Sequence, residues 1–151
     1  MDTAKVTTLP SAPQPAASDK PTQVSILAEL ERLALEVSAG TRRLVEMKAI
    51  LREGTPQEEL ISVELRVPNL DDMADIGSRA GLYYGASFDS LPSFDRELAR
   101  ARATVEVLAT KPYPAWLPLD KSGNIDTGQM LSYARLLAVA RNFNSFLVRF
   151  Q

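Results

Sequence analysis

Apolar residues between positions 24 and 53 recur at a spacing that strongly restricts how this segment can fold. With Gly40 filling one gap, the intervals alternate between four and three residues along Ile26, Leu30, Leu33, Val37, Leu44, Met47 and Leu51. This alternation is typical of a heptad seam on an α-helix. It predicts one helix over residues 24–53, about 45 Å long, with Thr22 as its N-cap and Gly54 just beyond its end.

The charges beside this seam do not fit an isolated parallel two-stranded coiled coil. In such a pair Arg43 would face Lys48, and the two positive charges would repel. Additional leucines at positions 27 and 35 also widen the apolar surface. We therefore expect the helix to pack in a bundle or between subunits, with an interface formed by Leu30, Leu33, Val37, Leu44 and Met47.

The pattern changes after this segment. Thr55, Pro56 and Glu58 form a helix-start signal. Residues 61–67 then alternate apolar and polar side chains, which predicts a strand. Its partner is either residues 115–119, or a strand of another subunit. The alternative is a continuous helix over residues 56–67.

The remaining chain predicts mainly helices. Asn69 can cap a helix over residues 70–84, and Ser93 can cap one over 94–110. Three prolines exclude a helix from residues 111–119, which should form an extended strap. A last helix is expected over residues 127–150. The expected fold is therefore mainly α: a single helical domain over residues 24–151, built as a bundle around one long heptad-patterned helix, with at most one short strand or hairpin.

Three glycines recur every four residues in the predicted helix 70–84, at Gly77, Gly81 and Gly85. Each glycine costs a helix about 1 kcal/mol relative to alanine, so a close approach of another backbone is the expected reason for them. We count all three as candidate interface residues. A break of the helix near Gly81 is the alternative.

Residues 1–23 are rich in proline, alanine and serine and hold few large apolar side chains. Such a segment cannot offset the entropy of its own ordering, so we expect it to be disordered in isolation. It is either an inert linker or an arm that orders on a partner. No secretory signal and no membrane-spanning apolar run are evident. The expected location is the cytoplasm of the host cell, or a virion if the protein is viral.

The chain has no cysteine and no histidine. This excludes disulfides, thiolate zinc sites and Ser-His-Asp or Cys-His catalysis. Asp71, Asp72 and Asp75 are interpreted as acids at a helix start. Residues 120–126 begin like a calcium-binding loop, but Ile125 stands where the loop needs glycine. We therefore expect no catalytic residues, no cofactor and no metal.

Charge is distributed unevenly along the chain. Residues 54–92 carry seven acids and two bases, whereas residues 93–151 carry five acids and eight bases. The basic half provides candidate phosphate contacts, namely Arg96, Arg100, Arg102, Arg141 and Arg149. An ordinary solvated surface explains the same residues.

These features together favour a non-enzymatic assembly or adaptor protein. The arm, the long helix, the strand without a partner and the glycine face are all means of contacting other protein subunits, most simply copies of the same chain. A phage or viral structural component is the concrete form expected from this architecture. The alternative is a nucleic-acid-binding accessory or regulatory protein that uses the basic half, and no contact with a membrane is expected.

Overall fold

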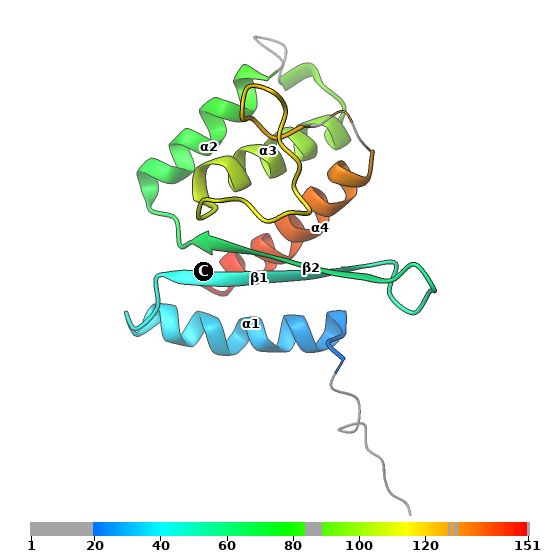
Figure 1. The fold of residues 1–151 in the computed structure, drawn as a ribbon. Helices are drawn as coiled ribbons and strands as arrows, with labels where there is room; N and C mark the ends of the chain where they lie inside the picture. The colour runs from blue at the N-terminus through cyan, green and yellow to red at the C-terminus, as the bar shows by residue number, and fades with distance from the viewer. Residues whose placement is uncertain (1–19, 84–88, 127, 129, 151) are drawn as a thin grey trace, which may run out of the picture.

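The computed structural model describes residues 20–83, 89–126, 128 and 130–150. In this part of the chain four α-helices accompany a two-stranded antiparallel sheet (Figure 1). The elements in chain order are α1 (Gln23–Ser38), β1 (Leu44–Leu51), β2 (Glu59–Arg66), α2 (Leu70–Leu82), α3 (Ser93–Leu108), α4 (Met130–Leu147) and a 3-10 turn, η4 (Val148–Phe150). The expectation of a helical bundle around one long heptad helix is therefore wrong, because the fold combines helices with a sheet.

The predicted helix over residues 24–53 is split into a helix and a strand. Helix α1 ends at Ser38, and Gly40 follows with a φ of 77°, a left-handed conformation that glycine adopts without strain. The amide groups of Gly40 and Thr41 donate to the carbonyl groups of Val37 and Glu36, which closes the end of the helix. The chain then reverses and continues as β1.

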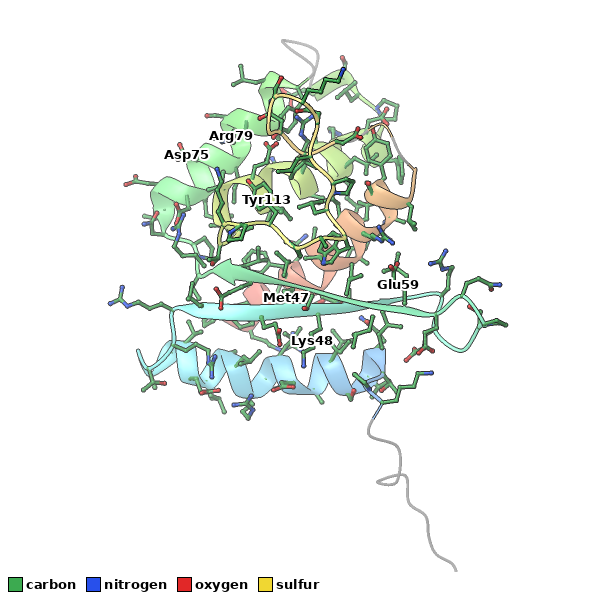
Figure 2. All side chains as sticks on the ribbon, viewed as in Figure 1. Met47, Lys48, Glu59, Asp75, Arg79 and Tyr113 are labelled. Carbon is green, nitrogen blue, oxygen red and sulfur yellow. The ribbon has the colours of Figure 1, made fainter. Side chains whose placement is uncertain are left out.

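Strand β1 supplies the partner that the predicted strand at 61–67 lacked. It pairs with β2 in an antiparallel register that places Val45 opposite Leu65 and Met47 opposite Val63. These side chains point to the buried face of the sheet, whereas Lys48 points to the other face (Figure 2). The alternative helix over 56–67 is wrong, and so is the pairing with residues 115–119.

The outer edge of β2 is covered by the segment that follows α3. The amide of Thr110 donates to the carbonyl of Glu64 at 3.0 Å, and the indole Nε1 of Trp116 donates to the carbonyl of Ser62 at 2.7 Å. Arg135 of α4 fixes the same region because it donates to both carboxylate oxygens of Glu59 and to the carbonyl of Trp116. Residues 111–119, predicted to be extended, contain no helix in the structure.

The main core lies where the hairpin meets α4. Helix α1 lies along one side of the hairpin, whereas α2 and α3 lie on the other side, and α4 reaches from α3 to the sheet (Figure 1). Large side chains fill this core, among them Leu30, Met47, Leu65, Phe143 and Phe146. A smaller cluster lies between α3, α4 and the strap and includes Val105, Leu117, Ile125 and Leu136.

The predicted capping residue is confirmed for α2 but not for α3. The side chain of Asn69 accepts from the amide of Asp72, and the carboxylate of Asp72 accepts from the amide of Asn69. This capping box begins α2 at Leu70. Helix α3 begins at Ser93, but Pro92 is its N-cap, and no side chain caps it.

The expected arm over residues 1–23 lies mostly outside the described residues, which begin at Lys20. Lys20 forms an ion pair with Glu58 at 2.7 Å, and the amide of Gln23 donates to Glu53 at 2.9 Å. Both acids lie in the turn between the end of β1 and the start of β2. The start of α1 is thus held at the turn end of the hairpin. None of the described helices is long and apolar enough to cross a membrane.

Candidate functional site

A groove runs between α2 and α4, both of which pack against α3. Its walls come from Met73 and Ile76 on α2 and from Phe143 and Leu147 on α4, while Ala101 of α3 lies between them. The hollow has a volume of about 220 Å³. Apolar side chains on two separate helices thus face a space that no described segment of the chain fills.

The groove continues into a wider mouth at one end of the molecule. The mouth has a volume of about 650 Å³ and shares Met73 and Leu147 with the groove. It is formed by the end of α1, the link between β2 and α2, and the C-terminal turn, with a lining of Val37, Ser38, Val67, Pro68, Asn69, Leu70, Met73, Leu147 and Phe150. None of these residues is charged. A segment bound here would meet almost entirely apolar and neutral side chains.

Large apolar side chains at the mouth are exposed to solvent. Leu70 is 88% exposed, Met73 46% and Phe150 41%. Single exposed apolar residues are ordinary on a protein surface, but several around one hollow mark an interaction site. Full burial of a side chain of this size contributes about 1.5–3 kcal/mol. A partner covering all three would therefore gain several kcal/mol.

The other end of the groove is polar. Arg141 of α4 donates through two nitrogens to the two carboxylate oxygens of Glu97 on α3, both at 2.9 Å. This contact holds the pKa of Glu97 below its ordinary value. Asn144 lines the groove close to this pair and is exposed. Its side-chain amide offers a donor and an acceptor to the backbone of a bound peptide.

The five residues of the interface predicted from the heptad seam lie partly in the core and partly at the surface. Leu30, Leu33 and Met47 are 2%, 7% and 0% exposed and belong to the core of the single chain. Their prediction as contacts between subunits is therefore wrong, because β1, β2 and α4 already cover them. Val37 lines the mouth, and Leu44 is 42% exposed at the start of β1.

Gly77 and Gly81 of α2 contact no backbone of another element among the described residues. A methyl group built at Gly77 or Gly81 would meet no atom within 4 Å. The close approach that we expected is thus not made by any described segment of the chain. Gly85 lies outside the described residues. The role of Gly77 and Gly81 at a subunit interface stays a prediction.

The predicted phosphate contacts do not form one patch of unpaired positive charge. Arg141 is bound to Glu97, and Arg149 lies 2.9 Å from Glu31. Arg102 lies 3.2 Å from Glu106 and stacks 4.0 Å above the ring of Tyr83. The other two residues, Arg96 and Arg100, lie on α3, where Arg96 contacts Ser93 and Arg100 lines the groove.

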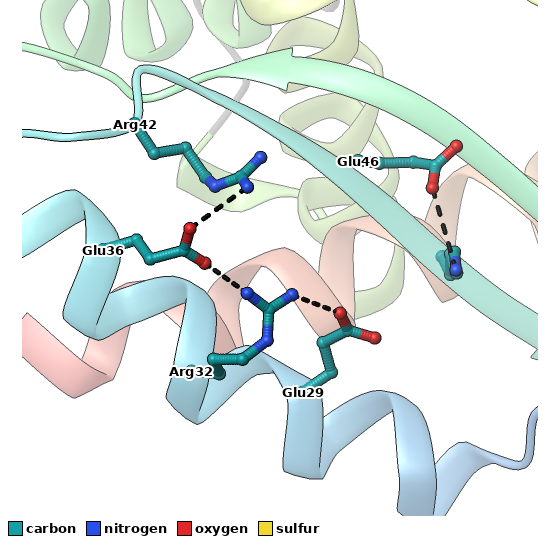
Figure 3. Close-up of polar contacts among 6 residues, drawn as sticks. Glu29, Arg32, Glu36, Arg42 and Glu46 are labelled. Carbon is teal, nitrogen blue, oxygen red and sulfur yellow. Dashed lines mark hydrogen bonds and ion pairs between the residues drawn. The ribbon is translucent and has the colours of Figure 1, made fainter.

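A second hollow, of about 210 Å³, lies between α1 and β1 and is lined by charged side chains. Here Arg32 bridges Glu29 and Glu36, and Arg42 reaches Glu36 at 3.2 Å (Figure 3). The guanidinium of Arg32 lowers the pKa of Glu29. The network joins α1 to the link that leads into β1. Two acids face two arginines in it, so the network offers no net charge to a ligand.

A polar cluster joins α2 to α3. The hydroxyl of Tyr83 donates to Glu106, whose carboxylate also faces Arg102 and, at 3.9 Å, Arg79. Burial and the bond to Glu106 raise the pKa of Tyr83. The hydroxyl is therefore protonated at neutral pH and available as the donor to Glu106.

Two of the acidic residues singled out in the sequence, Asp72 and Asp120, have structural roles. Asp72 caps α2, as described above. The carboxylate of Asp120 accepts from the amides of Ser122 and Asn124, which forms a turn. Among the described residues no three acids are grouped closely enough to hold a metal ion.

Comparison with known proteins finds no matching family model and no curated protein or solved structure of significant similarity. The groove therefore has to be interpreted from its own geometry. Sequence reasoning missed it because its lining comes from segments far apart in the chain. A local signal for it is the set of phenylalanines at positions 143, 146 and 150, of which Phe143 lines the groove and Phe150 lines the mouth.

Proposed function

We propose that this protein is a non-enzymatic assembly protein that self-associates by binding a protein segment in the groove between α2 and α4. The observation that carries this proposal is the open apolar mouth, where Leu70, Met73 and Phe150 surround a neutral hollow of about 650 Å³. Grooves of this kind bind helices or extended segments through a few apolar anchors. A structural component of a phage or viral particle is one form that such a protein takes.

The charged sites support this assignment indirectly. In the network around Arg32 two acids face two arginines, and at Glu106 both Arg102 and Arg79 already face a carboxylate of the same chain. The arginines proposed to contact phosphate are largely engaged with acids. A nucleic-acid-binding role consequently has less support than binding of a protein segment.

The test is the molar mass by light scattering across a wide range of concentration. We expect the full chain to exceed its monomer mass of 16.6 kDa. Leu70→Glu should reduce the mass to that of a monomer, because it puts a charge in the apolar mouth. Leu70 is 88% exposed, so the substitution should leave the fold intact.

Leu82→Glu is the matched control. Leu82 is 79% exposed at the other end of α2 and does not line the mouth. The control should keep the wild-type mass. A wild-type protein that is monomeric at every concentration would overturn the proposed function.

A further inference from the structure

We propose that the segment preceding Lys20 in one copy of the chain places Val6 and Leu9 in the mouth of the groove of a second copy. The inference rests on the proposed function, for which it names the occupant of the groove. Three observations support it: where the described chain begins, what the mouth is made of, and how long the preceding segment is.

The described chain begins at the end of the molecule opposite the mouth. Lys20 and Gln23 are held by Glu58 and Glu53 at the turn end of the hairpin. The mouth is lined by Val37 at the other end of α1, and a helix of 16 residues is about 24 Å long. Two different surfaces at opposite ends of a molecule suit a head-to-tail contact, in which each copy binds the next.

The preceding segment matches the neutral lining of the mouth. Residues 6–18 carry no charge, and Val6 and Leu9 are the large aliphatic side chains between residues 2 and 19. Burying a charged segment in an uncharged hollow would carry a large desolvation cost, which this segment avoids. Two apolar anchors three residues apart can fill the mouth beside Leu70 and Phe150.

The segment is also long enough for the contact. Eleven steps of the chain separate Leu9 from Lys20, and prolines at 10, 13 and 15 favour a stiff extended spacer. At about 3.1 Å per residue this spacer reaches about 34 Å. The start of the described chain is held at the hairpin turn, at the end of α1 away from its own mouth. We therefore assign the mouth to the segment of a neighbouring copy.

The first experiment compares two full-length double variants by light scattering. Val6→Asp with Leu9→Asp should shift the mass to that of a monomer, as Leu70→Glu does. The matched control is Thr3→Asp with Ser18→Asp, which adds the same two charges outside the anchors and should keep the wild-type mass.

The second experiment measures binding of a fluorescent synthetic peptide of residues 4–15 by anisotropy. The full-length Val6→Asp and Leu9→Asp protein has a vacant mouth under this proposal and should bind the peptide. Adding Leu70→Glu to that protein should weaken binding at least tenfold, whereas adding Leu82→Glu should not.

The outcomes separate this inference from the proposed function. If Leu70→Glu dissociates the assembly but the double variant at Val6 and Leu9 does not, another segment occupies the mouth and this inference is wrong, while the proposed function stands. If the peptide binds but the wild-type protein is a monomer at every concentration, the segment occupies its own mouth, and both the exchange between copies and the proposed self-association fail.

Discussion

At the scale of single residues, Asn142 connects three elements. Its Nδ2 donates to the carbonyl of Lys48 at 2.8 Å, and its Oδ1 accepts from Nε2 of Gln23 at 2.7 Å. Its side chain is buried. Asn142→Ala should lower the free energy of unfolding by about 1–3 kcal/mol, because a buried carbonyl loses its partner.

Urea unfolding monitored by circular dichroism measures this loss. Asn144→Ala is the control, since Asn144 lies two residues further along the same helix and is exposed. Its change should stay below about 0.5 kcal/mol. Equal losses in the two variants would contradict the role assigned to Asn142.

Asp72 provides a prediction about pH. Its carboxylate accepts from Arg66 and from the amide of Asn69, and the pKa of Asp72 is therefore held below its ordinary value. A depressed pKa stabilises the fold above the unfolded value and loses that contribution as the pH falls through the folded value. Asp72→Asn should be less stable than the wild type at pH 7, and the difference should shrink as the pH is lowered from about 4 to 2.

Thermal unfolding of both proteins at pH 7, 4 and 2 tests this prediction. Asp75→Asn serves as the control, because Asp75 is exposed on the same helix and has no ion pair in the described structure. A stability difference for Asp72→Asn that is constant over this range would exclude the ion pair as its source.

At the scale of elements, residues 44–51 show why the local pattern misled. Leu44, Met47 and Leu51 fit a helical seam, whereas Val45, Met47 and Ala49 fit a strand with one buried face. Pairing with β2 selects the strand, and a single sequence pattern does not contain that long-range information. By contrast, α2 begins where its own capping residue Asn69 predicts, because that signal is local.

Two glycines give predictions of opposite sign at this scale. Gly40 has a φ of 77°, so Gly40→Ala strains the turn after α1 and should destabilise the fold by about 1 kcal/mol or more. Gly77 lies inside α2 with open space around it, so Gly77→Ala should stabilise the fold by up to about 1 kcal/mol. Urea unfolding of both variants gives the comparison, and a shared sign would contradict this assignment of the turn and the helix.

At the scale of the whole molecule, the candidate site depends on contacts between distant segments. The mouth joins residues near positions 37, 68, 73 and 150, which the sequence alone gives no reason to bring together. The surface charge also depends on contacts between segments that are far apart in the sequence. The basic half of the sequence suggested a cationic surface, but Glu31 and Glu97 come from other helices and pair with Arg149 and Arg141.

This compensation predicts weak binding to nucleic acid. With a net charge of -2 and several paired arginines, the full chain should bind duplex DNA no more tightly than about 10 μM at physiological salt. Fluorescence anisotropy with a labelled 30-base-pair duplex measures the affinity. Glu31→Gln with Glu97→Gln frees Arg149 and Arg141, so this variant should bind more tightly and with a steeper dependence on salt. Submicromolar binding by the wild type that weakens steeply with salt would instead show that the arginines contact phosphate despite their acidic partners.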